Sequence, residues 1–249
     1  MEEIVIRHFD YLAPMYCFYC QKRNLYLRSL ENAVASEIEN RASTILRILD
    51  LGCGDGHRAE RIQKLLSSHH HWVGCDVSEK MLQIAALAAT HSSLIHCHAI
   101  DLPFPENHFD IVLALFNVIG YIFPRKRRME SLKRLYRILR PGGKLLLDVM
   151  NVMHIRDGSF RLPVARQLWR LIYSTFSPRL EGGDIRFTVQ VDESRLSVDG
   201  VVHTFFPPIF LHTLRRCGFQ ELSYHYIGYG TGIPRCSIFG GHLFVEATK

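Results

Sequence analysis

Between residues 45 and 149, short apolar runs alternate with longer segments in which apolar residues recur every three or four positions. The short runs are typical of buried strands, and the longer segments are typical of helices with one apolar face. The predicted strands span residues 45–51, 72–75, 94–98, 109–116 and 144–149, and the predicted helices span residues 58–66, 79–88 and 126–139. Strands separated by helices of about ten residues predict an α/β fold, a doubly wound and mostly parallel sheet with helices on both faces.

The N-terminal segment, residues 1–41, has a different pattern. It is rich in aromatic side chains and then becomes helical, because Leu25, Leu30, Val34 and Ile38 recur at near-helical spacing downstream of Pro14. We expect this segment to form a helical cap on the core.

After residue 151 the alternation of strands and helices breaks. Phe187, Val189 and Val191 alternate with polar residues, which is typical of a half-buried strand. Asp199-Gly200 is predicted to be a hairpin turn, with residues 201–206 as the returning strand. We therefore expect an inserted β-hairpin that serves as a lid.

We expect a single domain made of four parts. These are the cap at residues 1–41, a ligand-binding core at 42–150, the lid insertion at 151–209 and the C-terminal core strands at 210–249. Near the C-terminus, a helix is predicted at residues 209–217 and strands at 222–226 and 243–247. Nothing in the sequence predicts the oligomeric state.

Composition narrows the class of protein without identifying it. The chain has 249 residues, of which 47% are hydrophobic and 22% charged, and this excludes a disordered or collagen-like chain. Its longest apolar run, residues 111–123, is shorter than the roughly 20 residues needed to cross a bilayer. The N-terminal Met1-Glu2-Glu3 is acidic where a signal peptide would be basic. We therefore expect a cytoplasmic protein without a membrane partner.

Cysteine and histidine usage does not predict a metal site. Cys17 and Cys20 form a lone CxxC pair with no second pair to complete a zinc site, so reduced buried thiols are the better interpretation. The tract at residues 69–71 holds three histidines, but it falls in a short helix-to-strand connection and is interpreted as a solvated turn. No metal is expected.

A glycine-rich loop follows the first predicted strand. Gly52, Gly54 and Gly56 come directly after the apolar strand that contains Asp50, and such glycines let the backbone approach a ligand closely. The dinucleotide pattern GxGxxG requires a third glycine where this chain has His57. The acidic residues around the loop would repel a pyrophosphate and suit a ligand with a cationic ammonium group, so a nicotinamide dinucleotide is disfavoured.

This loop and the motifs after it resemble those of the class I S-adenosylmethionine (SAM) methyltransferases. The family's first motif, (E/D)xGxGxG, is matched by Asp50, Gly52, Gly54 and Gly56. Further motifs follow in the family's order at residues 73–78, 99–104, 109–112, 139–144 and 210–219. The resemblance implies a Rossmann-like, seven-stranded sheet whose last strand is antiparallel and a core reaction without metal. It also implies SAM as cofactor and S-adenosylhomocysteine (SAH) as product, bound at the carboxyl ends of the strands.

The resemblance also implies roles for individual residues. Asp76 would bind the ribose diol, because a carboxylate accepts both hydroxyl protons, while Met81 would pack on the adenine and Asp101 would accept from its amino group. Residues 9–16 resemble the FDxxAxxY stretch of quinone and small-molecule methyltransferases, which closes over SAM. The expected cofactor-binding residues are Tyr11, Tyr16, Arg28, Asp50, Gly52, Cys53, Gly54, Gly56, Asp76, Val77, Met81, Ile100, Asp101, Leu102, Phe116 and Asn117.

Some of these roles have competing interpretations. Tyr11 and Tyr16 either face the sulfonium with their rings or only pack within the cap. Arg28 either reaches the methionine carboxylate or is a solvated helix charge. Asn117 contacts the methionine part through its carbonyl or the substrate through its side chain, unless it is only a turn residue.

The acceptor is less well marked than the cofactor. Relatives that methylate DNA bases or glutamine carry an Asn/Asp-Pro-Pro-Tyr motif after the fourth strand, and residues 115–121 lack its prolines. This favours a small-molecule acceptor. The candidate catalytic residues are Asn117, Tyr121, His154 and His203. The two histidines are candidates for a general base because the ordinary histidine pKa suits that task.

We therefore expect methyl transfer by in-line displacement to an oxygen or nitrogen of a small molecule, and an aromatic or heterocyclic acceptor fits the aromatic cap. One alternative is an RNA methyltransferase, because residues 125–128 are all basic and the net charge is +6. That partner is disfavoured, since no RNA-binding domain or stacking platform accompanies the basic run. The other alternative is a SAM-binding protein of the same fold that transfers no methyl group.

Overall fold

The computed structural model describes residues 1–21, 23–41, 44–88, 90–154, 181–190 and 197–249. The N-terminal cap is mostly helical, in the order α1 (Glu2–Leu12), the short 3-10 helix η1 (Ala13–Met15), α2 (Tyr16–Gln21) and α3 (Asn24–Glu39). Pro14 lies in η1, where a proline is tolerated at the start of a helix, so it separates α1 from α2.

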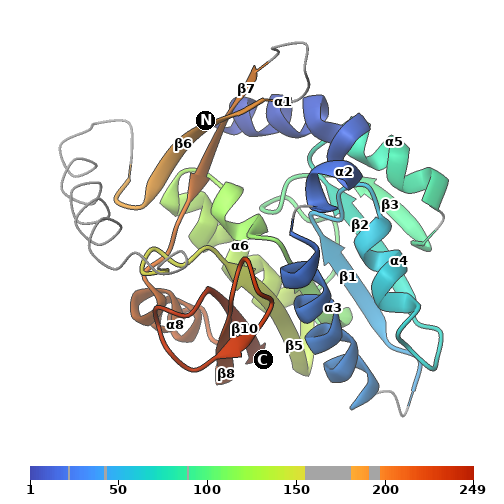
Figure 1. Ribbon diagram of the computed structural model, residues 1–249. Helices are drawn as coiled ribbons and strands as arrows, with labels where there is room; N and C mark the ends of the chain where they lie inside the picture. The colour runs from blue at the N-terminus through green and yellow to red at the C-terminus, as the bar shows by residue number, and fades with distance from the viewer. Residues whose placement is uncertain (22, 42–43, 89, 155–180, 191–196) are drawn as a thin grey trace.

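The core is a sheet of eight strands in the order β3-β2-β1-β4-β5-β10-β8-β9 (Figure 1). The strands are β1 (Arg47–Leu51), β2 (His71–Asp76), β3 (Ser93–His96), β4 (Phe109–Ala114), β5 (Leu139–Val149), β8 (Gln220–Ile227), β9 (Pro234–Arg235) and β10 (His242–Thr248). The first five are parallel, and β10 runs antiparallel to both β5 and β8. The predicted doubly wound sheet is confirmed, and the two-residue β9 adds an eighth strand.

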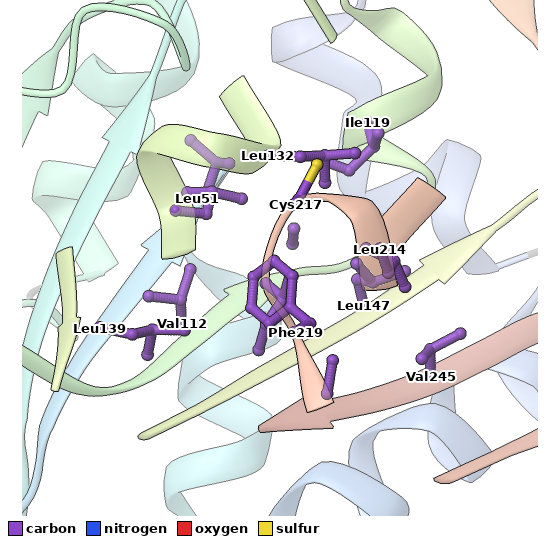
Figure 2. Close-up of a cluster of buried hydrophobic side chains, with 14 of the residues drawn as sticks. Leu51, Val112, Ile119, Leu132, Leu139, Leu147, Leu214, Cys217, Phe219 and Val245 are labelled. Atoms are coloured by element: carbon purple, nitrogen blue, oxygen red, sulfur yellow. The ribbon is translucent and has the colours of Figure 1, made fainter. Parts of the chain in front are cut away.

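Helices cover both faces of this sheet. Besides α3 of the cap, the helices after β1 are α4 (His57–Gln63), α5 (Glu79–Ala88), the short 3-10 helix η2 (Val118–Tyr121), α6 (Arg125–Ile138) and α8 (Pro207–Arg216). α3 and α4 bury Leu30 and Ile62 against one face, while α6 and α8 bury Leu132 and Leu214 against the other. Figure 2 shows the second cluster, in which Leu214 lies near Leu147 and Leu132 lies near Ile119. Central strands read as continuous apolar runs because both of their faces are buried.

The inserted hairpin is present, but its predicted turn is wrong. β6 (Asp184–Gln190) pairs antiparallel with β7 (Ser197–His203), and Asp199-Gly200 lies inside β7 opposite Thr188 and Phe187. A Cβ on Gly200 would lie 2.4 Å from Cζ of Phe187, so the glycine makes room for an aromatic ring instead of forming a turn. The chain between the two strands, including Val191 of the predicted alternation, falls outside the described residues.

The hairpin packs on α1 of the cap and on η2. Val201 of β7 shares a small apolar cluster with Val5 of α1 and Phe123. In Figure 1 the hairpin and α1 lie side by side above the carboxyl ends of the parallel strands. Among the helices that the structure describes, none is long and apolar enough to cross a membrane.

Candidate functional site

The glycine-rich loop leaves β1 in a conformation that favours glycine at three positions. Gly52, Gly54 and Gly56 have φ angles of 65°, 57° and 79°, in the left-handed region. A Cβ on Gly52 would also lie 2.5 Å from Cγ2 of Val118. The backbone N–H groups of Gly52 and Cys53 both donate to the carbonyl of Cys75, at 2.7 and 3.0 Å, and so fix the loop against β2.

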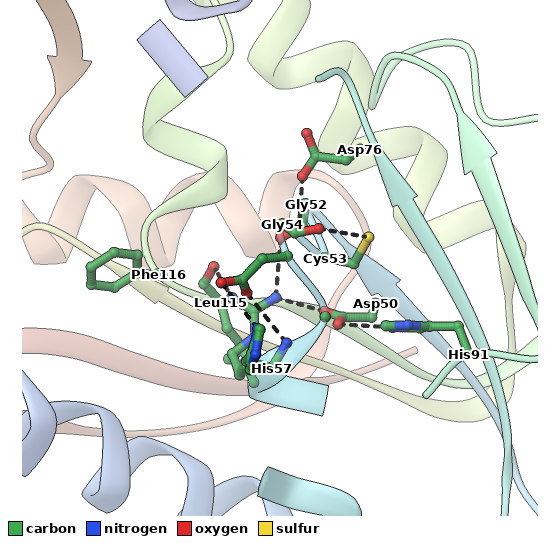
Figure 3. A network of polar contacts seen from close by, with 12 residues as sticks. Asp50, Gly52, Cys53, Gly54, His57, Asp76, His91, Leu115 and Phe116 are labelled. Carbon is green, nitrogen blue, oxygen red and sulfur yellow. Dashed lines mark hydrogen bonds and ion pairs between the residues drawn. The ribbon is translucent and has the colours of Figure 1, made fainter. Parts of the chain in front are cut away.

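A buried ion pair lies beneath this loop. Arg58 donates to the Asp50 carboxylate at 2.7 Å, and the same guanidinium reaches the carbonyls of Gly52 at 3.1 Å and Leu115 at 3.0 Å. Although burial opposes ionisation, Arg58 and His91 hold the pKa of Asp50 below its usual value. Figure 3 shows Asp50 and His91 in contact on the inner side of the loop. Asp50 is not among the residues that line the adjoining cleft, so it acts on the loop through Arg58.

A cleft lies beside the loop, with about 860 Å³ of empty space that is partly open to solvent. Of the expected cofactor-binding residues, those that line it are Tyr16, Gly52, Gly54, Asp76, Val77, Met81, Ile100 and Phe116. Asp76 is held at the end of β2 by the backbone N–H groups of Gly54 and Ser78, both at 2.9 Å. Burial raises the pKa of the Asp76 carboxyl despite these two donors. The arrangement presents a fixed hydrogen-bond acceptor to the cleft, which the apolar side chain of Met81 also lines.

The cap closes one side of the cleft, but only one of the two expected tyrosines takes part. Tyr16 lines the cleft together with Phe9, but Tyr11 is 39% exposed and lies away from it. Arg28 is exposed on α3 and does not line the cleft either. Sequence reasoning missed Asp10, whose carboxylate accepts from the Ser78 hydroxyl at 2.6 Å and ties α1 to the end of β2.

Four further residues from the expected set lie outside the cleft. Cys53 lines a smaller cavity of about 390 Å³ next to the loop, together with Arg58. Gly56 forms the N-terminal cap of α4. Asp101 is exposed, and Leu102 is buried in the apolar core. The expectation that these residues contact the cofactor stays a prediction.

A second cavity of about 790 Å³ adjoins the cleft. The two share four aromatic residues, Phe9, Tyr16, Phe116 and Tyr121. The second cavity is lined from α1, α2, the ends of β4 and β5, and the β6–β7 hairpin. We call it the acceptor cavity, because a ligand in it would lie against a ligand in the cleft.

The floor of the acceptor cavity is a strained turn held by β5. Phe116 and Asn117 both have left-handed backbones, with φ of 66° and 60°, which is rare for residues other than glycine. Asp148 accepts from the backbone N–H of Phe116 and from the Tyr26 hydroxyl, the latter at 2.6 Å. Asn117 Oδ1 accepts from the N–H of Met150 at 2.9 Å. The Asn117 side-chain oxygen therefore secures the turn, and Asn117 also lines the acceptor cavity. Its contact with cofactor or substrate stays a prediction.

Burial shifts the pKa of Asp148 and the pKa of His242, which both line this cavity. Desolvation raises the pKa of Asp148 to about 6, against hydrogen bonds from Tyr26 and Phe116 that favour the charged form. Burial, together with His154 and Arg23 nearby, lowers the pKa of His242 to about 3. His242 is therefore neutral at physiological pH, whereas Asp148 is ionised there with a substantial penalty.

The two histidines expected as general bases do not line the cleft or the acceptor cavity. His203 faces Asp184 at 2.6 Å in a separate cavity at the base of the hairpin. The ring of His154 lies 5.9 Å from that of His242. Tyr121 does line both the cleft and the acceptor cavity. Asp148 was missed, although a lone carboxylate in an apolar strand is a signal that the sequence carries.

Comparison with known proteins identifies the core of the chain. The methyltransferase domain family matches residues 48–143. A demethylmenaquinone methyltransferase of Listeria monocytogenes serotype 4a (strain HCC23) is 35% identical over 106 residues, which are 39% of this chain and 42% of that protein. A Homo sapiens protein named probable tRNA methyltransferase 9B is 31% identical over 134 residues, 52% of this chain and 28% of that protein. The chain spans less than half the length of these two curated relatives.

Solved structures share the fold at low identity. A SAM-dependent methyltransferase of Thermotoga maritima, described as a possible histamine N-methyltransferase, matches with a TM-score of 0.64 at 17% identity over 100% of both chains. A SAM-dependent methyltransferase of Clostridium acetobutylicum ATCC 824 matches with a TM-score of 0.64 at 13% identity, over 89% of this chain and 91% of the other. At these identities the likeness shows the fold alone.

Proposed function

We propose that this chain is a class I SAM-dependent methyltransferase that transfers the methyl group of SAM to a small molecule bound in the acceptor cavity. The match of residues 48–143 to the methyltransferase domain family and the fold shared with solved SAM-dependent methyltransferases support this proposal. The observation that carries the proposal is the aromatic-lined acceptor cavity, which shares Phe9, Tyr16, Phe116 and Tyr121 with the cleft. Sites for small molecules are typically concave, mostly apolar and furnished with a few polar groups.

The residues present in the cleft fit SAM. A Cβ on Gly54 would meet only the Tyr16 ring, at 3.5 Å, so the loop leaves room for a ligand beside its backbone. Asp76 offers a carboxylate to the two ribose hydroxyls. Met81 and Val77 supply an apolar surface for the adenine. Arg58 Nε is buried without a hydrogen-bond partner and lies next to the loop, where it suits the carboxylate of the amino-acid tail.

Bound SAM supplies an activated methyl group on a sulfonium. The chain's own contribution is to hold an acceptor in line with that group and to exclude water from the path, which is the positioning that makes a displacement fast. Phe9 and Tyr16 close the cleft from the cap, and the Asp10–Ser78 hydrogen bond holds the cap down. Phe187 of the hairpin completes the wall of the acceptor cavity, which is the lid role that we propose for the insertion.

RNA is the second candidate acceptor, and two observations bear on it. The match to the human protein named as a tRNA methyltransferase favours it. Against it, three of the seven basic residues of α6 are already engaged. Arg127 pairs with Glu2 and Arg128 with Glu181, while Arg134 donates to the carbonyls of Leu102 and Phe104. The exposed cations that remain on this helix are Arg125, Lys126, Lys133 and Arg137.

The two acceptor classes are separated by following the label from methyl-tritiated SAM. The protein is incubated with a cell extract divided into an RNA fraction and a fraction of small molecules. We expect label in the small-molecule fraction, and much less with the Phe187→Ala variant, which opens the wall of the acceptor cavity. Label in RNA that is lost when Lys126 and Lys133 are changed to alanine would contradict the proposal.

A further inference from the structure

Arg23, in the turn between α2 and α3, stands among aromatic rings at the wall of the acceptor cavity. Its guanidinium carbon lies 4.1 Å from the ring centre of Tyr19, 5.4 Å from that of Tyr229 and 5.7 Å from that of Phe116. Rings at these distances attract a cation and hold the guanidinium in place. Arg23 is therefore held close to Phe116, which lines both the acceptor cavity and the cofactor cleft.

The polar atoms of this guanidinium are only partly satisfied. Nη2 donates to the Tyr19 hydroxyl at 2.7 Å. Nη1 is buried and has no hydrogen-bond partner, and no carboxylate of the described chain lies within 4.0 Å of Arg23. A buried donor without a partner is unfavourable, and it is more so on a charged group. The structure thus leaves one donor, with a full positive charge behind it, for a ligand.

The other ionisable groups that line the acceptor cavity do not compensate this charge. Asp148 already accepts from the Tyr26 hydroxyl and from the backbone of Phe116. His242 is neutral at physiological pH because its pKa is lowered to about 3, and burial also lowers the pKa of His8. Among the described lining residues, Arg23 is the one cation without an anionic partner.

The walls define the shape of what binds there. The aromatic side chains that line the cavity are Phe9, Tyr16, Tyr19, Phe116, Tyr121, Phe187 and Tyr229. Aromatic rings pack best on flat, apolar partners, by stacking or by edge-to-face contact. A donor-only group at the edge of such a cavity selects a partner that presents an oxygen lone pair and, preferably, negative charge.

We propose that Arg23 determines the specificity of the acceptor cavity. The cavity takes a planar aromatic molecule with an ionised hydroxyl group, and the oxygen of that group accepts a hydrogen bond from Arg23 Nη1. This rests on the proposed function of the chain. The phenol loses its proton to water and binds as the phenolate. Its oxygen forms the bond to the methyl carbon as the carbon–sulfur bond breaks, and the electron pair of that bond stays on sulfur. The products are SAH and a neutral methyl ether, which no longer attracts Arg23.

Two probes of the same shape test this inference. 4-Nitrophenol is ionised at mildly alkaline pH, whereas 4-nitroaniline is neutral there. Binding of each probe is measured by calorimetry in the presence of saturating SAH. The proteins compared are the wild type, Arg23→Gln, Arg23→Lys and the control Arg7→Gln, which alters an exposed arginine of α1 paired with Glu3.

We expect the wild type and the control to bind 4-nitrophenolate at least tenfold more tightly than 4-nitroaniline. Arg23→Gln should remove this preference while SAH affinity changes less than twofold, and Arg23→Lys should restore part of it. Equal binding of the two probes to the wild type, or binding of neither, overturns the proposal. A large loss of SAH affinity in Arg23→Gln also overturns it, since Arg23 would then serve the cofactor. Failure of the wild type to bind SAH at all would instead refute the proposed function.

Discussion

Replacing Asp148 with asparagine should make the protein more stable at neutral pH, although this carboxylate has two hydrogen-bond donors. The carboxyl is fully buried, and its pKa is raised from 3.8 to about 6. Because the folded pKa lies above the unfolded value, the folded state binds more protons between the two values. Stability is therefore highest at low pH and falls as the pH rises through about 6. An asparagine keeps an acceptor for Phe116 without the charge.

The shift of about two pKa units corresponds to about 3 kcal/mol of lost stability at neutral pH, of which about 2 kcal/mol develops between pH 4.5 and 7.5. The assay is urea unfolding of the wild type and of Asp148→Asn at both pH values, since the difference between the two proteins cancels other titrating groups. We expect the variant's relative stability to rise by about 2 kcal/mol from the lower to the higher pH. A difference that does not depend on pH would refute the reasoning.

Two other substitutions test the loop that shapes the cleft. Gly52→Ala places a Cβ on a left-handed backbone and against Val118. We expect the free energy of unfolding in urea to fall by more than about 1 kcal/mol and SAH binding to weaken. Unchanged stability would contradict the close packing. Arg58→Met leaves the Asp50 carboxylate buried without its main partner, so we expect the free energy of unfolding to fall by about 3 kcal/mol. A second change, Asp50→Asn, should restore part of this stability. A double variant no more stable than the single one would show that the ion pair is not the cause.

The fold could be predicted largely from the sequence because its signals are local. The helix expected at residues 79–88 has those bounds in the structure, and each parallel strand appears where an apolar run predicts one. The hairpin turn was misplaced because Asp-Gly has the composition of a turn, whereas the requirement at Gly200 is set by the ring of Phe187 on the other strand. Contacts of that kind cannot be seen in one segment alone.

Part of the candidate site could also be predicted from local sequence motifs, and part could not. The glycine loop and Asp76 follow from a motif of neighbouring residues, and the structure brings them together at one cleft. The acceptor cavity is assembled from residues that are distant in the sequence. Tyr26 and Asp148, for example, are 122 positions apart and are joined by one hydrogen bond. The unpartnered donor of Arg23 is equally a property of the folded chain, because only the folded chain buries Nη1 away from any hydrogen-bond acceptor.

The central claim is that the cleft binds SAM through Asp76, and calorimetric titration tests it most directly. The wild type, Asp76→Ala and the exposed control Glu79→Gln are titrated with SAM, SAH and NAD. We expect one molecule of SAM or SAH to bind to the wild type and the control, and at least tenfold weaker binding to Asp76→Ala, since hydrogen bonds to a charged group contribute about 1.5–3 kcal/mol. Binding of NAD alone, or equal SAH affinity in Asp76→Ala, would contradict the account.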